Sequence, residues 1–265
     1  MRSEQREFAN QVVLIVGASS GIGRVVATRL AAEGARLVVT ARNADKLESL
    51  AAEITARGGE CLALPADALD AAAAEHVVAT AVARCGGIDI ALLNAGGAPA
   101  IDMRTMKAAE VTHYMRTNYD VTVNYLFPVL EHMKRRRAGF VAHTNSLAGF
   151  LGVPLQGPYS AAKAATRLLI DTCRIEFADW GIQFLNVYPG FVATEATRSD
   201  GMPAPLEISE EKAADHILHA LRKEKSDYLF PLSMRWLIRL ARILPKPILN
   251  RILARELPPL GTPVG

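Results

Sequence analysis

The chain has 265 residues, of which 50% are hydrophobic and 22% are charged, and its 30 basic and 27 acidic side chains leave a net charge of +3. This length is sufficient for one large α/β domain with a full hydrophobic core. Because the net charge is small, it excludes a protein that binds nucleic acid through its overall field, and we expect no nucleic-acid partner.

The first residues and the cysteines favour a cytoplasmic protein. Residues 1–11 contain no apolar signal core, and no run of 18 or more apolar residues occurs in the chain. Cys61, Cys85 and Cys173 are odd in number and lack zinc-like spacing, which is typical of a reducing compartment. We therefore expect a cytoplasmic location.

Short β-branched segments alternate with Ala- and Leu-rich helical segments from residue 12 to about 190. This alternation is typical of βαβ units, so it predicts a single doubly wound α/β domain over residues 1–231 with a parallel sheet, followed by an extension of the same domain over 232–265. The expected strands are Val12–Val16, Arg36–Thr40, Glu60–Leu64, Ile88–Leu93, Gly139–Thr144 and Ile182–Val187. The expected helices cover 22–33, 44–57, 70–85, 111–136, 158–180 and 209–222.

The segment LIVGASSGIG at 14–23 fits two kinds of site. Residues 17–21 match the G-x-S-x-G turn of α/β-hydrolases, which would make Ser19 a nucleophile. That turn needs several strands before it, whereas only residues 1–11 precede the first expected strand. A phosphate-binding loop explains more of the segment, because Gly17 permits a tight turn, while Gly21 and Gly23 let phosphate oxygens approach a helix N-terminus.

Polar side chains follow two later strands. Asn94-Ala95-Gly96 stands at the carboxyl end of the fourth strand, the edge at which open α/β sheets bind ligands. Ser146 precedes Tyr159 by thirteen residues, and Lys163 follows Tyr159 by four, so the tyrosine and the lysine share one helix face. A neighbouring ammonium group favours the phenolate, and a hydroxyl donor stabilises a developing oxyanion, so these three groups suit acid/base chemistry on a carbonyl.

Taken in this order, the glycine loop, Asn-Ala-Gly, Ser146, Tyr-x-x-x-Lys and YPGFVAT at 188–194 resemble the short-chain dehydrogenase/reductase family over about residues 10–195. The resemblance implies a Rossmann-like fold. It also implies that Tyr159 is the general acid/base, that Lys163 lowers the pKa of Tyr159 and holds the nicotinamide ribose, and that Ser146 orients the carbonyl. Asn118, on the expected helix 111–136, would link Lys163 to solvent through water.

The sequence departs from the family pattern at Val16, Leu93 and Asn145, none of which replaces a catalytic group. The resemblance further implies a subunit contact through helices 111–136 and 158–180, so we expect a homodimer or homotetramer.

The end of the second strand favours NADP(H) over NAD(H). Ala41 stands where NAD enzymes usually carry an acid, and Arg42 can pair with a 2′-phosphate, with Ser19 as a second donor. Ser20 stands where NADP members of the family often add a basic residue, so NAD(H) remains an alternative. The expected cofactor contacts are Gly17, Ser19, Ser20, Gly21, Ile22, Gly23, Arg42, Asp67, Asn94, Ala95, Gly96, Tyr159, Lys163, Pro189, Gly190, Val192 and Thr194.

The residues after 231 form two basic amphipathic segments. Arg235, Arg239 and Arg242 share one helical face, and Arg251 and Arg255 repeat the arrangement after two prolines. Such helices can contact a membrane surface through 232–257, close over the substrate pocket or pack between subunits, and the sequence leaves these alternatives open. An extension this apolar favours a lipophilic substrate.

These observations predict an NADP(H)-dependent oxidoreductase that interconverts a ketone and a secondary alcohol on a lipid-, steroid- or polyketide-like substrate, which the loops 97–103, 147–158 and 191–208 would bind. The alternative is a non-catalytic dinucleotide-binding regulatory or membrane-associated scaffold protein. His216 and His219 have metal-like spacing without a third ligand nearby, so we expect no metal.

Overall fold

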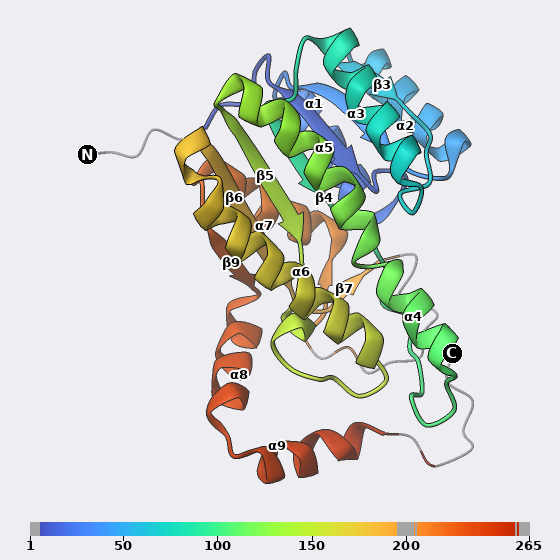
Figure 1. Cartoon of the computed structure of the whole chain (residues 1–265), viewed down its shortest axis with the longest axis vertical. Coiled ribbons are helices and arrows are strands. Elements are labelled where there is room, and N and C mark those ends of the chain that lie inside the picture. Colours follow the sequence, from blue (N-terminus) through green and yellow to red (C-terminus); the bar gives the residue numbers. More distant parts are fainter. Residues whose placement is uncertain (1–5, 195–203, 205, 258, 260–265) are drawn as a thin grey trace.

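The computed structural model describes residues 6–194, 204, 206–257 and 259, and within them seven parallel strands form one sheet (Figure 1). The order across the sheet is β3-β2-β1-β4-β5-β6-β9. The strands are β1 (Val12–Val16), β2 (Arg36–Thr40), β3 (Glu60–Ala63), β4 (Ile90–Leu93), β5 (Gly139–Thr144), β6 (Ile182–Pro189) and β9 (Asp227–Phe230). The direction of winding reverses between β1 and β4, the point at which such sheets bind ligands. The doubly wound, single-domain prediction is confirmed.

Helices cover both faces of the sheet, with α5 and α6 in front of it and α7 behind it in Figure 1. They are α1 (Gly21–Ala32), α2 (Ala44–Ala56), α3 (Ala71–Cys85), α4 (Ala108–Arg116), α5 (Asp120–Arg136), α6 (Gly157–Glu176), α7 (Glu210–Arg222), α8 (Leu232–Ile243) and α9 (Lys246–Leu253). Side-chain caps begin several of them: Asp70 accepts hydrogen bonds from the N–H groups of Ala72 and Ala73, and Ser209 accepts one from Lys212.

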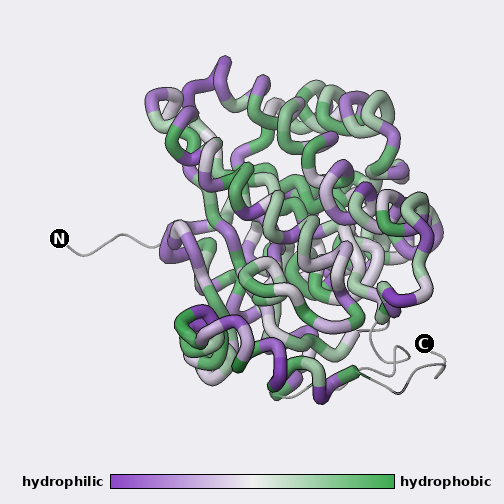
Figure 2. The backbone as a smooth tube through the Cα atoms, turned by 60° about the horizontal axis from the view of Figure 1, so that its bottom comes forward, coloured by the Kyte–Doolittle hydropathy of each residue, from purple (hydrophilic) through white to green (hydrophobic). Residues whose placement is uncertain are grey.

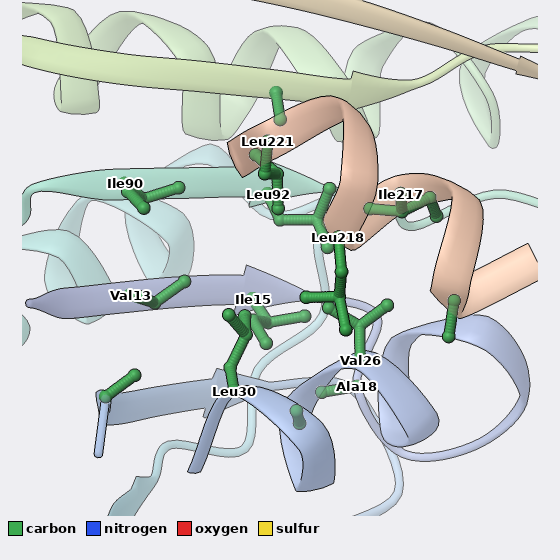
Figure 3. Close-up of a cluster of buried hydrophobic side chains, with 14 of the residues drawn as sticks. Val13, Ile15, Ala18, Val26, Leu30, Ile90, Leu92, Ile217, Leu218 and Leu221 are labelled. Atoms are coloured by element: carbon green, nitrogen blue, oxygen red, sulfur yellow. The ribbon is translucent and has the colours of Figure 1, made fainter. Parts of the chain in front are cut away.

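The central strands are apolar throughout because each buries side chains on both faces of the sheet. On β1, Val13 and Ile15 join the core under α1, α2 and α7, whereas Val12, Leu14 and Val16 join the core under α3, α5 and α6. Figure 3 shows the first of these cores, in which side chains of α1 and α7 lie over β1 and β4. The two cores hold the carboxyl edge of the sheet rigidly in place.

The single helix expected over 111–136 is wrong, because the structure divides it into α4 and α5. Thr117 and Asn118 lie between the two helices, and both side chains donate to the backbone carbonyl of Tyr114. Side chains that compete in this way for helical carbonyls favour an interruption. Asn118 therefore lies at a break between helices and not within a helix.

Other expected boundaries also change. The expected helix 158–180 ends at Glu176 and is followed by a separate 3₁₀ turn, Ala178–Trp180. The sequence analysis missed β9, which extends the sheet beyond β6, and a small two-stranded sheet of β7 (Val192–Ala193) with β8 (Ile208–Ser209). These strands have two to four residues, which is too short for an alternating pattern to stand out.

The C-terminal extension follows β9 as α8 and α9, at the bottom of Figure 1. Met234, Ile238 and Ala241 of α8 are buried against the domain, whereas α9 buries none of its residues. Among the helices of the described residues, none has both the length and the apolar character needed to cross a bilayer.

Candidate active site

A large cavity of about 1010 Å³ opens at the carboxyl ends of the strands. Residues from the glycine loop, from the segments after β2, β4, β5 and β6, and from α6 and α8 line it. Every residue expected to contact the cofactor belongs to this lining except Gly23, and of the four expected catalytic residues only Asn118 does not. The fold therefore collects in one place side chains that are up to about 180 residues apart in the sequence.

The glycine loop is held against neighbouring backbone. The N–H of Gly17 donates to the Thr40 carbonyl at 2.8 Å, and the side-chain amide of Asn94 donates to the Gly17 carbonyl at 3.2 Å. A side chain at Gly17 would meet the backbone of Ala95 at 2.9 Å, and Gly17 has a φ of +84°. A Cβ on Gly23 would lie 2.1 Å from the Gly17 carbonyl oxygen. Gly23 thus serves loop packing, and not the close approach of a ligand that the sequence suggested.

The N-terminus of α1 faces this cavity. Ser20 is the N-cap residue, yet its side chain makes no capping hydrogen bond to the first turn. Ser19, Ser20, Gly21 and Ile22 all line the cavity. Open N–H groups at a helix start, together with the helix dipole, form a binding site for an anion such as a phosphate group. The residues present fit the pyrophosphate of a dinucleotide.

Two charged residues mark the far end of the cavity. Arg42 follows β2, is exposed, and forms no ion pair with any residue that the structure describes. Asp67 follows β3, and its carboxylate accepts a hydrogen bond from the N–H of Leu69 at 3.0 Å. An unpaired guanidinium at the cavity edge is available to a phosphate group.

Ser146 and Tyr159 meet at the near end of the cavity. Ser146 follows β5 and begins a 3₁₀ turn, Leu147–Phe150, in which its Oγ accepts a hydrogen bond from the N–H of Ala148 at 3.1 Å. Tyr159 stands in the first turn of α6. Burial raises the pKa of Tyr159, and a hydrogen bond with the Ser146 hydroxyl partly opposes this rise. The phenol is therefore protonated at neutral pH.

Lys163 lies one helical turn after Tyr159 and is only 3% exposed. Its Nζ donates to the Thr144 carbonyl at 2.8 Å and lies 5.6 Å from the centroid of the Tyr159 ring. Burial lowers the pKa of Lys163 to about 8, so the ammonium form is retained at pH 7. The structure thus brings together the three side chains that the sequence singled out.

Asn118 approaches this group from the break between α4 and α5. It is buried, and its Oδ1 accepts a hydrogen bond from the N–H of Gly97 at 3.0 Å. A Cβ on Gly96 would lie 2.7 Å from Asn118 Oδ1 and 3.7 Å from Lys163 Nζ, so both side chains border the same glycine. The absence of a side chain at Gly96 is what allows this approach.

The segment after β6 closes the cavity on its other side. The N–H of Gly190 donates to the Phe230 carbonyl at 2.9 Å, which ties this segment to β9. Pro189, Val192 and Thr194 belong to the cavity lining. Part of the expected substrate loop 191–208, namely 195–203 and 205, lies outside the described residues.

Comparison with known proteins identifies the family. The family model described as short chain dehydrogenase matches residues 11–203. The chain belongs to the short-chain dehydrogenase family. It is 28% identical over 244 residues to an uncharacterized oxidoreductase of Myxococcus xanthus, an alignment that covers 92% of this chain and 96% of the relative. It is also 33% identical over 191 residues to a 3-oxoacyl-(acyl-carrier-protein) reductase of Staphylococcus epidermidis, covering 72% of this chain and 78% of the relative.

A solved structure gives the same result for the fold of this short-chain dehydrogenase. The crystal structure of levodione reductase superposes with a TM-score of 0.76 at 28% identity, covering 85% of this chain and 96% of the other. The protein is thus an oxidoreductase of a family that binds nicotinamide dinucleotides.

A buried polar network beneath the catalytic residues was not predicted from the sequence. The Asn145 side chain accepts a hydrogen bond from the Ser146 N–H at 2.8 Å and donates one to the Lys163 carbonyl at 3.1 Å. His143 Nδ1 lies 3.2 Å from Asn186 Oδ1, and burial followed by the charge of Lys163 lowers the pKa of His143 to about 3. Asn145 thereby joins the serine to the helix that carries the lysine, a link between elements that no local pattern reveals.

The histidine pair on α7 has a structural explanation. His216 stacks on Phe230 with ring centroids 4.6 Å apart, and its Nδ1 lies 3.3 Å from the Tyr228 hydroxyl. Over the described residues, no group of three or more potential ligands could hold a metal ion.

Lys163→Met is expected to change the pH dependence of stability in the cofactor-free protein. The pKa of Lys163 is about 8 when folded and 10.5 ordinarily, so between these pH values the unfolded chain binds more protons and stability rises with pH. The cost of burying the ammonium is complete below pH 8 and is relieved towards pH 10.5. The Met variant should therefore gain on the wild type at pH 7 by about 3 kcal/mol more than at pH 10.5.

The measurement is urea unfolding of both proteins at several pH values. Loss of the hydrogen bond to Thr144 does not depend on pH below 8, so it cancels from the comparison. Lys225→Met, at an exposed lysine, is the matched control and should show no such difference. A stability difference for Lys163→Met that stays constant with pH would contradict this account.

Proposed function

We propose that the protein is an NADP(H)-dependent oxidoreductase that interconverts a ketone and a secondary alcohol on a lipophilic substrate. The observation that carries the proposal is the meeting of Ser146, Tyr159 and Lys163 in the cavity that the glycine loop also lines. Relatives named as reductases of a 3-oxoacyl group and of levodione support reduction as the reaction type.

In the proposed reaction, Tyr159 is the proton donor. Because its pKa is raised, its Oη holds a proton at neutral pH and donates it to the carbonyl oxygen of the ketone. Ser146 Oγ donates a hydrogen bond to the same oxygen and stabilises its developing negative charge. When bound, the nicotinamide supplies the hydride.

Two further residues restore the proton on Tyr159. The ammonium of Lys163, beside the ring, stabilises the phenolate that remains after the transfer. Asn118, which borders Gly96 together with Lys163, is placed to pass a proton from solvent through water. In the reverse direction the same groups accept the proton of a secondary alcohol.

NADP(H) is the proposed cofactor because Arg42 is a free cation at the cavity edge after β2. A guanidinium group can bind a 2′-phosphate through two parallel charge-assisted hydrogen bonds. Ser19 lines the same end of the cavity and can donate a further hydrogen bond. Asp67 would lie near the adenine, and Thr194 near the carboxamide.

A lipophilic substrate is proposed because the remaining wall of the cavity is apolar. Leu147, Phe191, Met234 and Ile238 line it, and the last two come from α8. Apolar walls with a few polar groups at one end are typical of sites that bind and orient small apolar molecules.

We also propose a homodimer or homotetramer that pairs α5 and α6. Phe127 on α5 and Leu168 and Ile175 on α6 are exposed apolar side chains that such a contact would cover.

The test is steady-state oxidation of NADPH and NADH with ketones of graded hydrophobicity. We expect turnover with NADPH to exceed that with NADH and to increase with ketone hydrophobicity. Arg42→Ala should lower kcat/KM for NADPH about tenfold and change that for NADH by less than about twofold, since only the phosphate loses a charge-assisted partner.

Each outcome separates a different part of the proposal. Cofactor binding without turnover on any ketone would favour the non-catalytic scaffold. Equal losses with both cofactors in Arg42→Ala would count against the phosphate contact, and a preference for small hydrophilic ketones would exclude the lipophilic substrate.

A further inference from the structure

We propose that α8 and α9 form a docking face for an anionic lipid bilayer, which the protein binds peripherally. The proposal does not depend on the reaction assigned to the cavity. It is based on the side chains that these two helices expose, on their charge and on what the helices leave uncovered.

The outer side of the two helices is apolar and exposed. Trp236 is 63% exposed and Ile243 80% exposed, although large apolar side chains of this kind are usually buried. The exposed apolar side chains of the two helices are Leu232, Trp236, Leu237, Leu240, Ile243, Ile248 and Ile252. Together they form a contiguous series along two consecutive helices, which marks an interaction surface.

The charge of the same segment has one sign. Residues 232–255 contain six basic side chains and no Asp or Glu. None of the six forms an ion pair within the described part of the chain, although the rest of the protein pairs many of its arginines. Figure 2, in which the bottom of the molecule comes forward, shows hydrophobic and hydrophilic residues alternating along both helices. Exposed apolar side chains among unpaired cations complement a bilayer that contains anionic lipid.

The inner side of α8 and the position of α9 argue against the other occupants. Met234 and Ile238 on the inner side of α8 line the cavity, whereas no residue of α9 does, so a lid over the pocket does not explain α9. A second copy of this chain, if it bound through the same face about a two-fold axis, would bring two sets of six cations together. A membrane surface has the opposite charge and satisfies both features.

The experiment is co-sedimentation of the full-length protein with phosphatidylcholine vesicles and with vesicles in which phosphatidylglycerol replaces part of the phosphatidylcholine. We expect binding to the anionic vesicles only, weakened at high salt because surface charge is screened. Trp236 emission should shift to shorter wavelength on binding, and Trp236→Phe, which leaves Trp180, should remove that shift.

Charge reversal tests the face itself. Arg239→Glu/Arg251→Glu changes two exposed arginines on α8 and α9 and should weaken vesicle binding at least about tenfold. Arg84→Glu/Lys225→Glu is the matched control, since it changes the net charge equally at exposed residues that precede β4 and β9, at the opposite edge of the sheet. The control should retain wild-type binding. Far-ultraviolet circular dichroism and thermal unfolding check that both variants fold.

Three results would overturn the proposal. The first is no binding to anionic vesicles. The second is equal loss of binding in the test and control variants, which would mean attraction by net charge alone. The third is a change in oligomeric state of Arg239→Glu/Arg251→Glu by light scattering without any lipid binding, which would assign the face to a second copy.

Discussion

Tyr159→Phe is expected to lower kcat for ketone reduction by about 100- to 10,000-fold, the usual contribution of a positioned general acid. The change removes the hydroxyl that is hydrogen-bonded to Ser146 but keeps the ring that lies beside Lys163. The cavity should therefore keep its shape, and NADPH should bind with unchanged affinity. Stopped-flow or steady-state NADPH oxidation measures the loss, and fluorescence titration measures the binding.

Tyr114→Phe is the matched control for this variant. Tyr114 comes from α4 and also lines the cavity, but it does not belong to the Ser146 and Lys163 group. It should retain turnover within about tenfold of the wild type. If Tyr159→Phe kept full turnover, the assigned mechanism would be wrong, whereas loss of NADPH binding in that variant would point to a structural effect.

Gly23→Ala is expected to weaken NADPH binding by at least about tenfold and to lower the free energy of unfolding by about 1–3 kcal/mol. The added Cβ would lie 2.1 Å from the Gly17 carbonyl oxygen and 2.9 Å from Asn94 Nδ2. Because the first of these neighbours is backbone, the glycine loop itself must move. The loop carries the residues that line the cavity at the N-terminus of α1, so its displacement should disturb the binding of phosphate groups.

Gly152→Ala provides the comparison for Gly23→Ala. A Cβ on Gly152 meets no atom within 4 Å, and its φ lies outside the left-handed region, so this alanine should leave both stability and NADPH affinity unchanged. Calorimetric titration with NADPH and thermal unfolding measure both quantities. Wild-type NADPH affinity in Gly23→Ala would show that the loop tolerates displacement and does not position the phosphates.

The sequence predicted those parts of the fold and the site that depend on local patterns. The β1 segment is apolar at every position because it buries both faces, which distinguishes a central parallel strand from an amphipathic one. The spacing of Tyr159 and Lys163 by four residues places both on one face of α6, and the structure agrees. The reversal of winding between β1 and β4 likewise follows from the alternation of strands and helices.

Where the sequence prediction failed, an interaction distant in the chain decided the structure. The apolar pattern over 111–136 continues through Asn118, but its side chain bonds to Gly97 and to Tyr114, and the helix breaks there. The strand β9 has four residues, and its pairing with β6 supplies the order that its own pattern lacks. Asn145 looked like a minor departure from a family motif until the fold placed it between Ser146 and the Lys163 carbonyl.

By itself, the sequence determined the doubly wound fold class, the glycine loop and the Ser146, Tyr159 and Lys163 set, because each depends on residue types at fixed local spacing. Only the tertiary structure decided that Asn118 and Lys163 border the same glycine, and that α8 places one side in the cavity wall and leaves the other exposed. Contacts of this kind depend on how elements far apart in the chain pack together, and the free energy of that packing is not encoded in any single segment.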